Sequence, residues 1–263
     1  MNSEAKLMTY GAHLDVFRRA LLRILLITMV CACIIFFFKE TTFNILLAPS
    51  EWDFCTYRWI EQIINIFNSG FHFDEFCVDL IATDLSSQFM THITTAIYLG
   101  LLCASPFILY ELFKFVSPAL LENEKRYSVQ IVFTVYALFL VGVLMSYYVI
   151  FPISFRFLGT YSVAEKIHST ITLDSYISTF VTLTLLMGVV FQLPVIAFIL
   201  GKMGIVTSHY LAKYRRYAIL IICLISAIIT PPDIMTLILV ATPLYMLYEL
   251  SIRVIRYIEN QNK

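Results

Sequence analysis

Long runs of apolar residues, separated by short polar connections, dominate this chain. A helix needs roughly 20 largely apolar residues to cross the hydrocarbon core of a bilayer. Four runs reach about that length, and two shorter ones follow them. The six predicted spans are residues 21–38, 91–113, 128–151, 176–200, 217–229 and 234–252. The pattern therefore predicts an all-α membrane protein with six transmembrane helices, folded as a single membrane domain over residues 1–263.

The fifth run is short, and a pair of prolines sets its end. Residues 217–229 form 13 positions, which reach only about 20 Å as a helix. The sequence Thr230-Pro231-Pro232-Asp233 comes directly after them. Because proline cannot continue a helix, this junction predicts a tight hairpin between the fifth and sixth spans.

Composition and charge indicate the orientation of the spans. Hydrophobic residues make up 60% of the chain and charged residues 14%, and the formal net charge is +0, which gives no indication of a nucleic-acid partner. Basic residues accumulate in cytoplasmic loops. They split 14 to 4 in favour of the face that holds both termini. Both termini are therefore predicted to be cytoplasmic, with residues 39–90 forming an acidic cap on the periplasmic side.

The cysteines allow two interpretations. Cys55 and Cys77 both fall in the predicted cap. On a periplasmic face they either form a disulfide or remain two free thiols or partly buried small residues, and the sequence does not decide between these alternatives. The other four lie within predicted spans, where cysteine behaves as a small apolar residue. No metal-ligand spacing occurs among the six.

The sequence also lacks the common motifs of catalysis. It has no His-Glu-x-x-His, Gly-x-Ser-x-Gly, Walker or Gly-x-Gly-x-x-Gly pattern, so we expect neither an enzyme nor a cofactor. A secondary transporter of a small solute, the alternative that six helices allow, would carry charges near the middle of several spans. Such charges are almost absent, because Glu111 and Glu249 lie near the cytoplasmic ends of their helices. Glu249 stands four residues before Arg253, a spacing that permits a helical ion pair.

One polar side chain, Gln192, lies deep in the fourth predicted span. Pro194 follows two residues later and frees a backbone carbonyl one turn earlier. The amide of Gln192 then has two alternative partners: a carbonyl of its own helix, or a helix of another protein.

An apolar stripe precedes the first span. It recurs at steps of three and four residues through Leu7, Tyr10, Leu14, Phe17 and Leu21. His13, Arg18 and Arg19 occupy the opposite face. This segment is therefore predicted to form a short amphipathic helix along the membrane.

Eight short motifs follow one another along the chain. They are His13-Leu14-Asp15-Val16-Phe17-Arg18, Leu47-Ala48-Pro49, Ala82-Thr83-Asp84 with Phe89, Ser105-Pro106-Phe107-Ile108-Leu109-Tyr110, Phe115-x-x-Pro118-Ala119-Leu120 with Glu124 and Arg126, Phe151-Pro152, Gln192-Leu193-Pro194, and Thr230-Pro231-Pro232-Asp233. In this order, and on the predicted sides of the membrane, they resemble the TatC family, the membrane receptor subunits of the twin-arginine protein translocase.

The resemblance implies a multi-pass receptor in the bacterial cytoplasmic (inner) membrane. Such a receptor binds the twin-arginine signal peptides of folded precursor proteins. It assembles with single-span subunits of the TatA and TatB types, and with itself in a larger complex, for export driven by the proton motive force. No cofactor, metal or catalytic residue is implied.

The resemblance also implies two groups of site residues. The signal-peptide site comprises His13, Asp15, Arg18, Pro118, Leu120, Glu122 and Glu124. The contact with partner helices comprises Phe191, Gln192, Pro194 and Asp233. Glu124 is the first choice for binding two guanidinium groups, because a carboxylate accepts paired hydrogen bonds from arginine. Its alternative role is an ion pair with Lys125, Arg126 or Arg215.

Three positions depart from the family pattern. Val16 stands where the family has a glutamate in its first helix, and the neighbouring Asp15 is turned by about 100 degrees around a helix. Gln192 stands where the family often has an acid in its fourth helix, so it keeps the hydrogen bonding and loses the charge. Leu237 stands where the family has a glutamine in its sixth helix. The departure at Val16 places more of the expected signal-peptide binding on Glu124.

Overall fold

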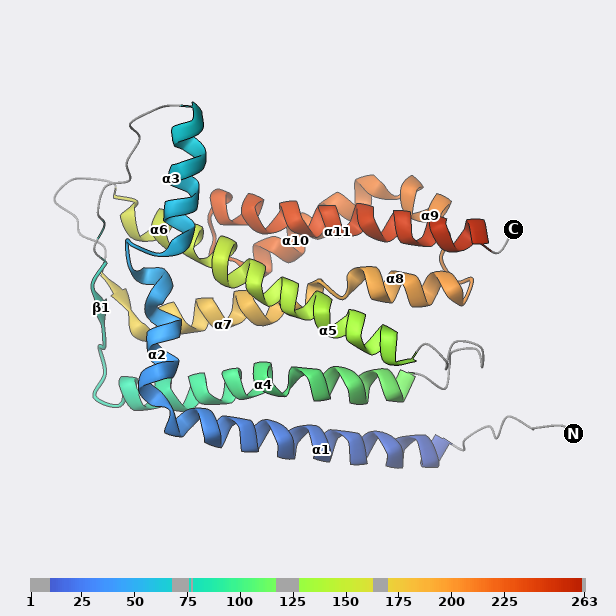
Figure 1. Ribbon diagram of the computed structural model, residues 1–263, viewed down its shortest axis with the longest axis horizontal. Coiled ribbons are helices and arrows are strands. Elements are labelled where there is room, and N and C mark those ends of the chain that lie inside the picture. The colour runs from blue at the N-terminus through green and yellow to red at the C-terminus, as the bar shows by residue number, and fades with distance from the viewer. Residues whose placement is uncertain (1–9, 68–75, 77, 117–127, 163–169, 262–263) are drawn as a thin grey trace, which may run out of the picture. The chain divides into compact units, whose positions relative to one another are not determined.

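The computed structural model is almost entirely helical (Figure 1) and describes all residues except 1–9, 68–75, 77, 117–127, 163–169 and 262–263. Its helices are α1 (Tyr10–Phe37), α2 (Lys39–Leu47), α3 (Cys55–Phe67), α4 (Ser87–Val116), α5 (Ser128–Met145), α6 (Phe151–Thr160), α7 (Leu173–Val190), α8 (Leu193–Lys202), α9 (Ser208–Lys213), α10 (Arg215–Ile229) and α11 (Ile234–Gln261). A 3-10 turn, η1 (Ala48–Ser50), follows α2, and a π-helical turn, η4 (Ser146–Ile150), joins α5 to α6. Strands β1 (Leu80–Ile81) and β2 (Ile171–Thr172) pair in parallel.

The chain packs as two compact units. Unit 1 consists of Met1–Phe38 and Ala96–Tyr136, and it therefore holds α1 and the C-terminal part of α4. Unit 2 consists of Lys39–Thr95 and Ala137–Lys263, and it holds the cap segment and the C-terminal helices. The two units are described separately below.

Five helical stretches of the described chain are long and apolar enough to cross a membrane. They are Asp15–Phe37, Ser87–Leu112, Val132–Thr160, Leu173–Lys202 and Ile234–Asn260. The sixth helix, α10, has 15 residues and is about 22 Å long. The predicted all-α fold with six membrane helices is confirmed. The amphipathic segment predicted ahead of the first span is helical from Tyr10 onward and continues without a break into that span.

The hairpin between α10 and α11 forms at the predicted prolines. Thr230 ends α10, since both its backbone N–H and its hydroxyl donate to the carbonyl of Ser226, at 2.9 Å each. Asp233 begins α11, because its carboxylate accepts the backbone N–H of Thr236 at 2.7 Å and also the Thr236 hydroxyl. Each helix end is thus closed by a side chain of the Thr-Pro-Pro-Asp junction, which is why α10 and α11 are two separate helices instead of one.

Asp233→Ala should lower the free energy of unfolding by about 1 kcal/mol, because the first turn of α11 loses its N-terminal cap. Asp233→Asn is the matched control, since its side-chain oxygen still accepts the Thr236 N–H, and it should lose much less. Thermal unfolding in a mild detergent measures both variants. Equal losses would show that the charge of Asp233, rather than its cap, carries the effect.

An aromatic cluster of α6 and α7 is hydrogen-bonded to the cap. Phe151 packs edge-to-face on Tyr176 and Phe180, with ring centroids 5.0 and 4.9 Å away. The Tyr176 hydroxyl donates to the carbonyl of Leu46 in α2 at 2.8 Å. Burial raises the pKa of Tyr57 in α3, so its phenol remains a donor at physiological pH. The cap is therefore hydrogen-bonded to unit 2 through uncharged groups.

Candidate functional site

In unit 1, α1 and α4 approach one another so closely that only a glycine fits at one point. A Cβ atom added to Gly100 of α4 would lie 2.7 Å from the backbone nitrogen of Ala32 in α1. Real Cβ atoms do not come so close to backbone, so a larger residue would push the helices apart. Small residues allow this kind of contact between membrane helices. The contact therefore fixes the spacing of α1 and α4.

An ion pair joins the same two helices nearer their other ends. Nη1 of Arg23 donates to Oε1 of Glu111 at 2.8 Å. The Glu111 side chain is buried, with 6% of its surface exposed, whereas that of Arg23 is 52% exposed. The ion pair and the Gly100–Ala32 contact lie about three turns apart along each helix, as antiparallel packing requires. Together they fix both the spacing and the register of α1 and α4.

In unit 2, a break separates α7 from α8 at Gln192. The backbone N–H of Gln192 bonds to the carbonyl of Val189 instead of Gly188. The Gln192 side-chain amide donates to that Gly188 carbonyl at 3.4 Å. Phe191 and Pro194 on either side are buried. Of the two alternatives open in the sequence, the structure thus contains the hydrogen bond to the residue's own helix.

Two glycines bring α5 against α7 beside this break. A Cβ on Gly142 would lie 2.6 Å from the carbonyl oxygen of Met187, and one on Gly188 would lie 2.6 Å from the ring of Phe139. One turn further on, the buried hydroxyls of Ser146 and Thr184 lie 3.3 Å apart. The α7–α8 break is therefore held against α5 by close backbone packing and one polar contact.

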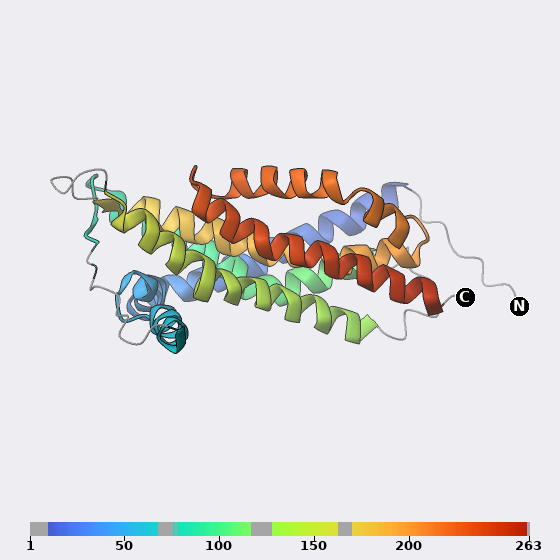
Figure 2. The ribbon, with the colours of Figure 1, turned by 90° about the horizontal axis from the view of Figure 1, so that it is seen from above.

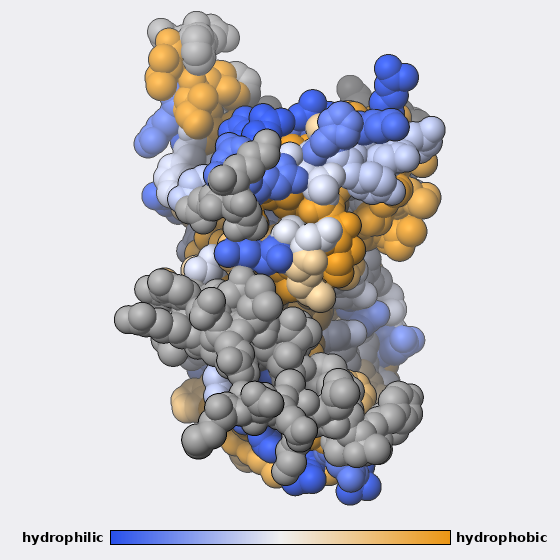
Figure 3. Space-filling view, turned by 90° about the vertical axis from the view of Figure 1, so that its right-hand side faces the viewer, coloured by the Kyte–Doolittle hydropathy of each residue, from blue (hydrophilic) through white to orange (hydrophobic). Residues whose placement is uncertain are grey.

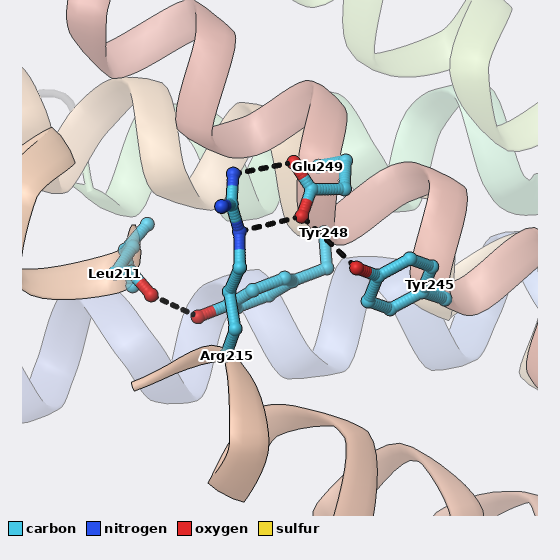
Figure 4. A network of polar contacts seen from close by, with 5 residues as sticks. All are labelled: Leu211, Arg215, Tyr245, Tyr248 and Glu249. Atoms are coloured by element: carbon cyan, nitrogen blue, oxygen red, sulfur yellow. Dashed lines mark hydrogen bonds and ion pairs between the residues drawn. The ribbon is translucent and has the colours of Figure 1, made fainter. Parts of the chain in front are cut away.

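A polar network ties α10 to α11 (Figure 4). Nε and Nη2 of Arg215 lie 2.7 and 2.9 Å from the two carboxylate oxygens of Glu249. The Tyr245 hydroxyl donates to Glu249 at 3.2 Å, and the Tyr248 hydroxyl donates to the carbonyl of Leu211 in α9 at 2.8 Å. Glu249 thus pairs across the hairpin, and the pairing with Arg253 that its helical spacing permits is not the one observed. A fork-shaped contact with Arg215 satisfies both carboxylate oxygens.

Comparison with known proteins identifies the family. The family model "Sec-independent protein translocase protein (TatC)" matches residues 12–243. The chain is 30% identical to a TatC protein of Blattabacterium sp. subsp. Periplaneta americana, over 99% of this chain and 100% of that protein. It is 32% identical to one of Desulforapulum autotrophicum, over 96% and 86%. The chain belongs to the TatC family.

A solved structure shares the fold. The crystal structure of a twin-arginine translocase receptor TatC superimposes with a TM-score of 0.74 at 30% identity, covering 93% of this chain and 98% of that one. As a TatC protein, the chain is a multi-pass inner-membrane component of the Sec-independent protein translocase. It is a transport protein rather than an enzyme, and the alternative of a small-solute transporter is set aside.

The structure places part of the predicted signal-peptide site. Asp15 and Arg18 lie on exposed positions of α1, with Nη2 of Arg18 at 3.9 Å from Oδ1 of Asp15. Val16, at the position of the TatC glutamate, is exposed beside them. His13 is in α1, but its side chain is outside the described residues, as are Pro118, Leu120, Glu122 and Glu124. Their binding roles remain predictions.

The residues predicted to contact partner helices have structural roles in TatC that the sequence did not reveal. Phe191 and Pro194 are buried at the α7–α8 break, and Asp233 caps α11. Cys55 begins α3, and Cys77 lies outside the described residues, so their pairing stays a prediction. Within the described ranges, no cluster of His, Cys, Asp or Glu has the arrangement of a metal site.

Sequence reasoning missed the Arg23–Glu111 pair. The two residues are far apart in the chain, and Glu111 was expected merely to lie near a helix end. The sequence did contain an indication of this pair. An acid in one apolar span and a base in another are expected to pair with each other, because an unpaired charge is costly in lipid. The pair joins α1, which contains Asp15 and Arg18, to α4, which is followed in the sequence by Glu122 and Glu124.

Proposed function

We propose that this chain is the signal-peptide receptor of a twin-arginine translocase, with its binding site at the cytoplasmic ends of α1 and α4. The observation that carries the proposal is the register of these two helices. Arg23–Glu111 and Ala32–Gly100 run antiparallel, so the turn with Asp15 and Arg18 lies level with the end of α4 at Val116. Residue 117, where the motif with Glu124 continues, follows directly in the sequence.

Charge supports the same site. Two consecutive arginines carry two guanidinium groups, each of which binds best to a carboxylate that accepts two hydrogen bonds. Glu124 and Glu122 come from the segment after α4, and Asp15 comes from α1. The Asp15–Arg18 pair is long and exposed on both sides, and such pairs are worth at most about 1 kcal/mol. An incoming arginine can therefore replace Arg18 as the partner of Asp15.

Glu124→Gln should weaken binding of a twin-arginine peptide by roughly 10- to 100-fold, because it removes a charge-assisted contact worth about 1.5–3 kcal/mol. The measurement is site-specific photocrosslinking, or affinity in nanodiscs, with an Arg-Arg peptide and its Lys-Lys counterpart. Glu40→Gln, which makes the same change in the predicted periplasmic cap and outside the proposed site, is the matched control and should retain the preference for Arg-Arg. An unchanged preference in Glu124→Gln would overturn the assignment of the site.

We propose further that single-span subunits of the TatA or TatB type pack against unit 2 near α10. This short helix exposes apolar side chains along its length, among them Ile221, Leu224 and Ile228. Gln192 is half-buried in the neighbouring α7–α8 break. Copurification from membranes tests this assembly, since single-span subunits and twin-arginine precursors should come with the intact chain. Absence of both from the purified complex would contradict the proposal.

A further inference from the structure

Helix α3 of the cap has an apolar half that the rest of unit 2 covers only in part. Its inner side is fixed by hydrogen bonds. The buried Tyr57 hydroxyl lies 3.0 and 2.9 Å from the carbonyl oxygens of Pro49 and Pro152 and shares its one hydrogen between them. The Thr56 hydroxyl donates to the carbonyl of Tyr148. Ile60 and Ile64 are half-buried on the same side. These contacts hold α3 in one orientation.

The rest of the apolar half is exposed. Trp59, Ile63 and Ile66 are 57%, 59% and 78% exposed. Steps of four and three residues place them on one face of the helix, at about 100 degrees per residue. That face adjoins the buried side, while Arg58, Gln62 and Asn65 lie on the opposite, polar half. The stripe is thus a continuous apolar surface with a polar border, as in helices that lie in a membrane interface.

The orientation of α3 suits this position. It runs across the direction of α6, α7 and α11 instead of along it (Figures 1 and 2), and it lies at the rim of unit 2. Figure 3 looks along the spanning helices from the end with the C-terminus. It shows hydrophobic residues of α3 at the upper left, on the side turned toward the viewer and hence toward the level of the membrane.

The stripe also lies beside exposed apolar residues of a membrane span. Val141 and Leu144 in the span Val132–Thr160 are about half exposed. Four residues after Leu144, in the π-helical turn η4, comes the half-buried Tyr148. The Trp59 ring stacks on Tyr148 with centroids 6.4 Å apart and an interplanar angle of 28°. The apolar surface therefore passes without interruption from the spanning helix to α3.

We propose that α3 lies in the interface of the periplasmic leaflet, with Trp59, Ile63 and Ile66 inserted at the boundary between headgroups and acyl chains. Tryptophan is enriched at this depth because its ring is apolar and its N–H is polar. Insertion removes the two isoleucines from water, while the polar half of α3 remains hydrated. The cap is then anchored twice, by its hydrogen bonds to unit 2 and by the lipid surface.

The two tryptophans of this chain allow a direct test. Trp52→Phe leaves Trp59 as the sole indole. In proteoliposomes of phosphatidylcholine brominated near the headgroup end of its acyl chains, fluorescence of Trp59 should fall at least twofold relative to unbrominated lipid. Bromine near the end of the chains should quench it less. Emission typical of an indole in water, without quenching, would overturn the proposal; so would blue-shifted emission that bromine leaves unchanged, since a protein then covers the stripe.

Two adjacent substitutions in the Trp52→Phe background separate lipid contact from a general effect of charge. Ile63→Glu places a charge within the stripe, and it should at least halve the quenching of Trp59 and shift its emission to the red. Gln62→Glu places the same side chain on the polar half, and it should leave the quenching unchanged. Both positions are exposed, so neither change disturbs the core. Equal effects of the two variants would contradict insertion of the stripe.

Discussion

Arg23→Met should lower the free energy of unfolding by about 3 kcal/mol, whereas Glu111→Gln should cost clearly less. The asymmetry follows from burial. Glu111 is almost fully buried, so removal of Arg23 leaves a carboxylate without a partner inside unit 1. Arg23 is half exposed, so removal of the glutamate charge leaves a guanidinium that can turn toward water. Thermal unfolding in detergent should show a drop of roughly 6–12 °C for Arg23→Met.

The double variant Arg23→Met with Glu111→Met is the control for this ion pair. It replaces both charges by apolar side chains, and it should recover most of the stability that Arg23→Met loses. Binding of the Arg-Arg peptide should recover in parallel, because the pair acts by holding α1 and α4 in register and does not touch the peptide. Losses that simply add in the double variant would show that the two residues are not coupled.

Gly100→Ala should destabilise unit 1 by about 2–3 kcal/mol. The added methyl group would lie 2.7 Å from the backbone of Ala32, and backbone cannot turn aside as a side chain can. Helices α1 and α4 must then separate, which also loosens the Arg23–Glu111 pair. The measurements are the unfolding temperature and the affinity for the Arg-Arg peptide, and both should fall.

Gly201→Ala in α8 is the matched control for Gly100→Ala. Its Cβ would meet the side chain of Ile255 at 3.1 Å, and that side chain can shift by a few tenths of an ångström. Alanine also favours a helix over glycine by about 1 kcal/mol. Gly201→Ala should therefore be neutral or slightly stabilising. A loss equal to that of Gly100→Ala would contradict the importance of the close backbone approach.

The membrane-spanning helices could be predicted from the sequence because each is encoded locally, whereas α2, α3 and α9 were not predicted. An apolar run of sufficient length predicts a span, and Pro231 and Pro232 predict the end of α10 at Ile229. In the sequence, Pro194 predicts a freed backbone carbonyl within one span, whereas the structure has a break between α7 and α8 at Gln192. Beside the break, Gly188 packs against Phe139 of α5, a contact between residues that local sequence patterns do not relate.

The candidate site was harder to predict for the same physical reason. The family motifs indicate Asp15 and Glu124, but not what holds their segments together. That depends on a salt bridge and a backbone contact between α1 and α4, whose partners are distant in the chain. Likewise, the spacing of Glu249 and Arg253 permitted an ion pair within α11. In the structure, the α10–α11 hairpin brings Arg215 to Glu249, and the carboxylate pairs with Arg215 instead.

The hydrogen bonds of the cap determine an order of assembly during synthesis. Tyr57 and Thr56 bind to carbonyls of Pro152 and Tyr148, and Leu46 accepts from Tyr176. Leu80 and Ile81 pair with Ile171 and Thr172. Every one of these partners leaves the ribosome later than the cap residue that it meets. After its translocation, the cap therefore cannot complete its hydrogen bonds until the third span and the start of the fourth have been inserted. Completion of the cap then requires that the first three spans have been inserted in the correct orientation.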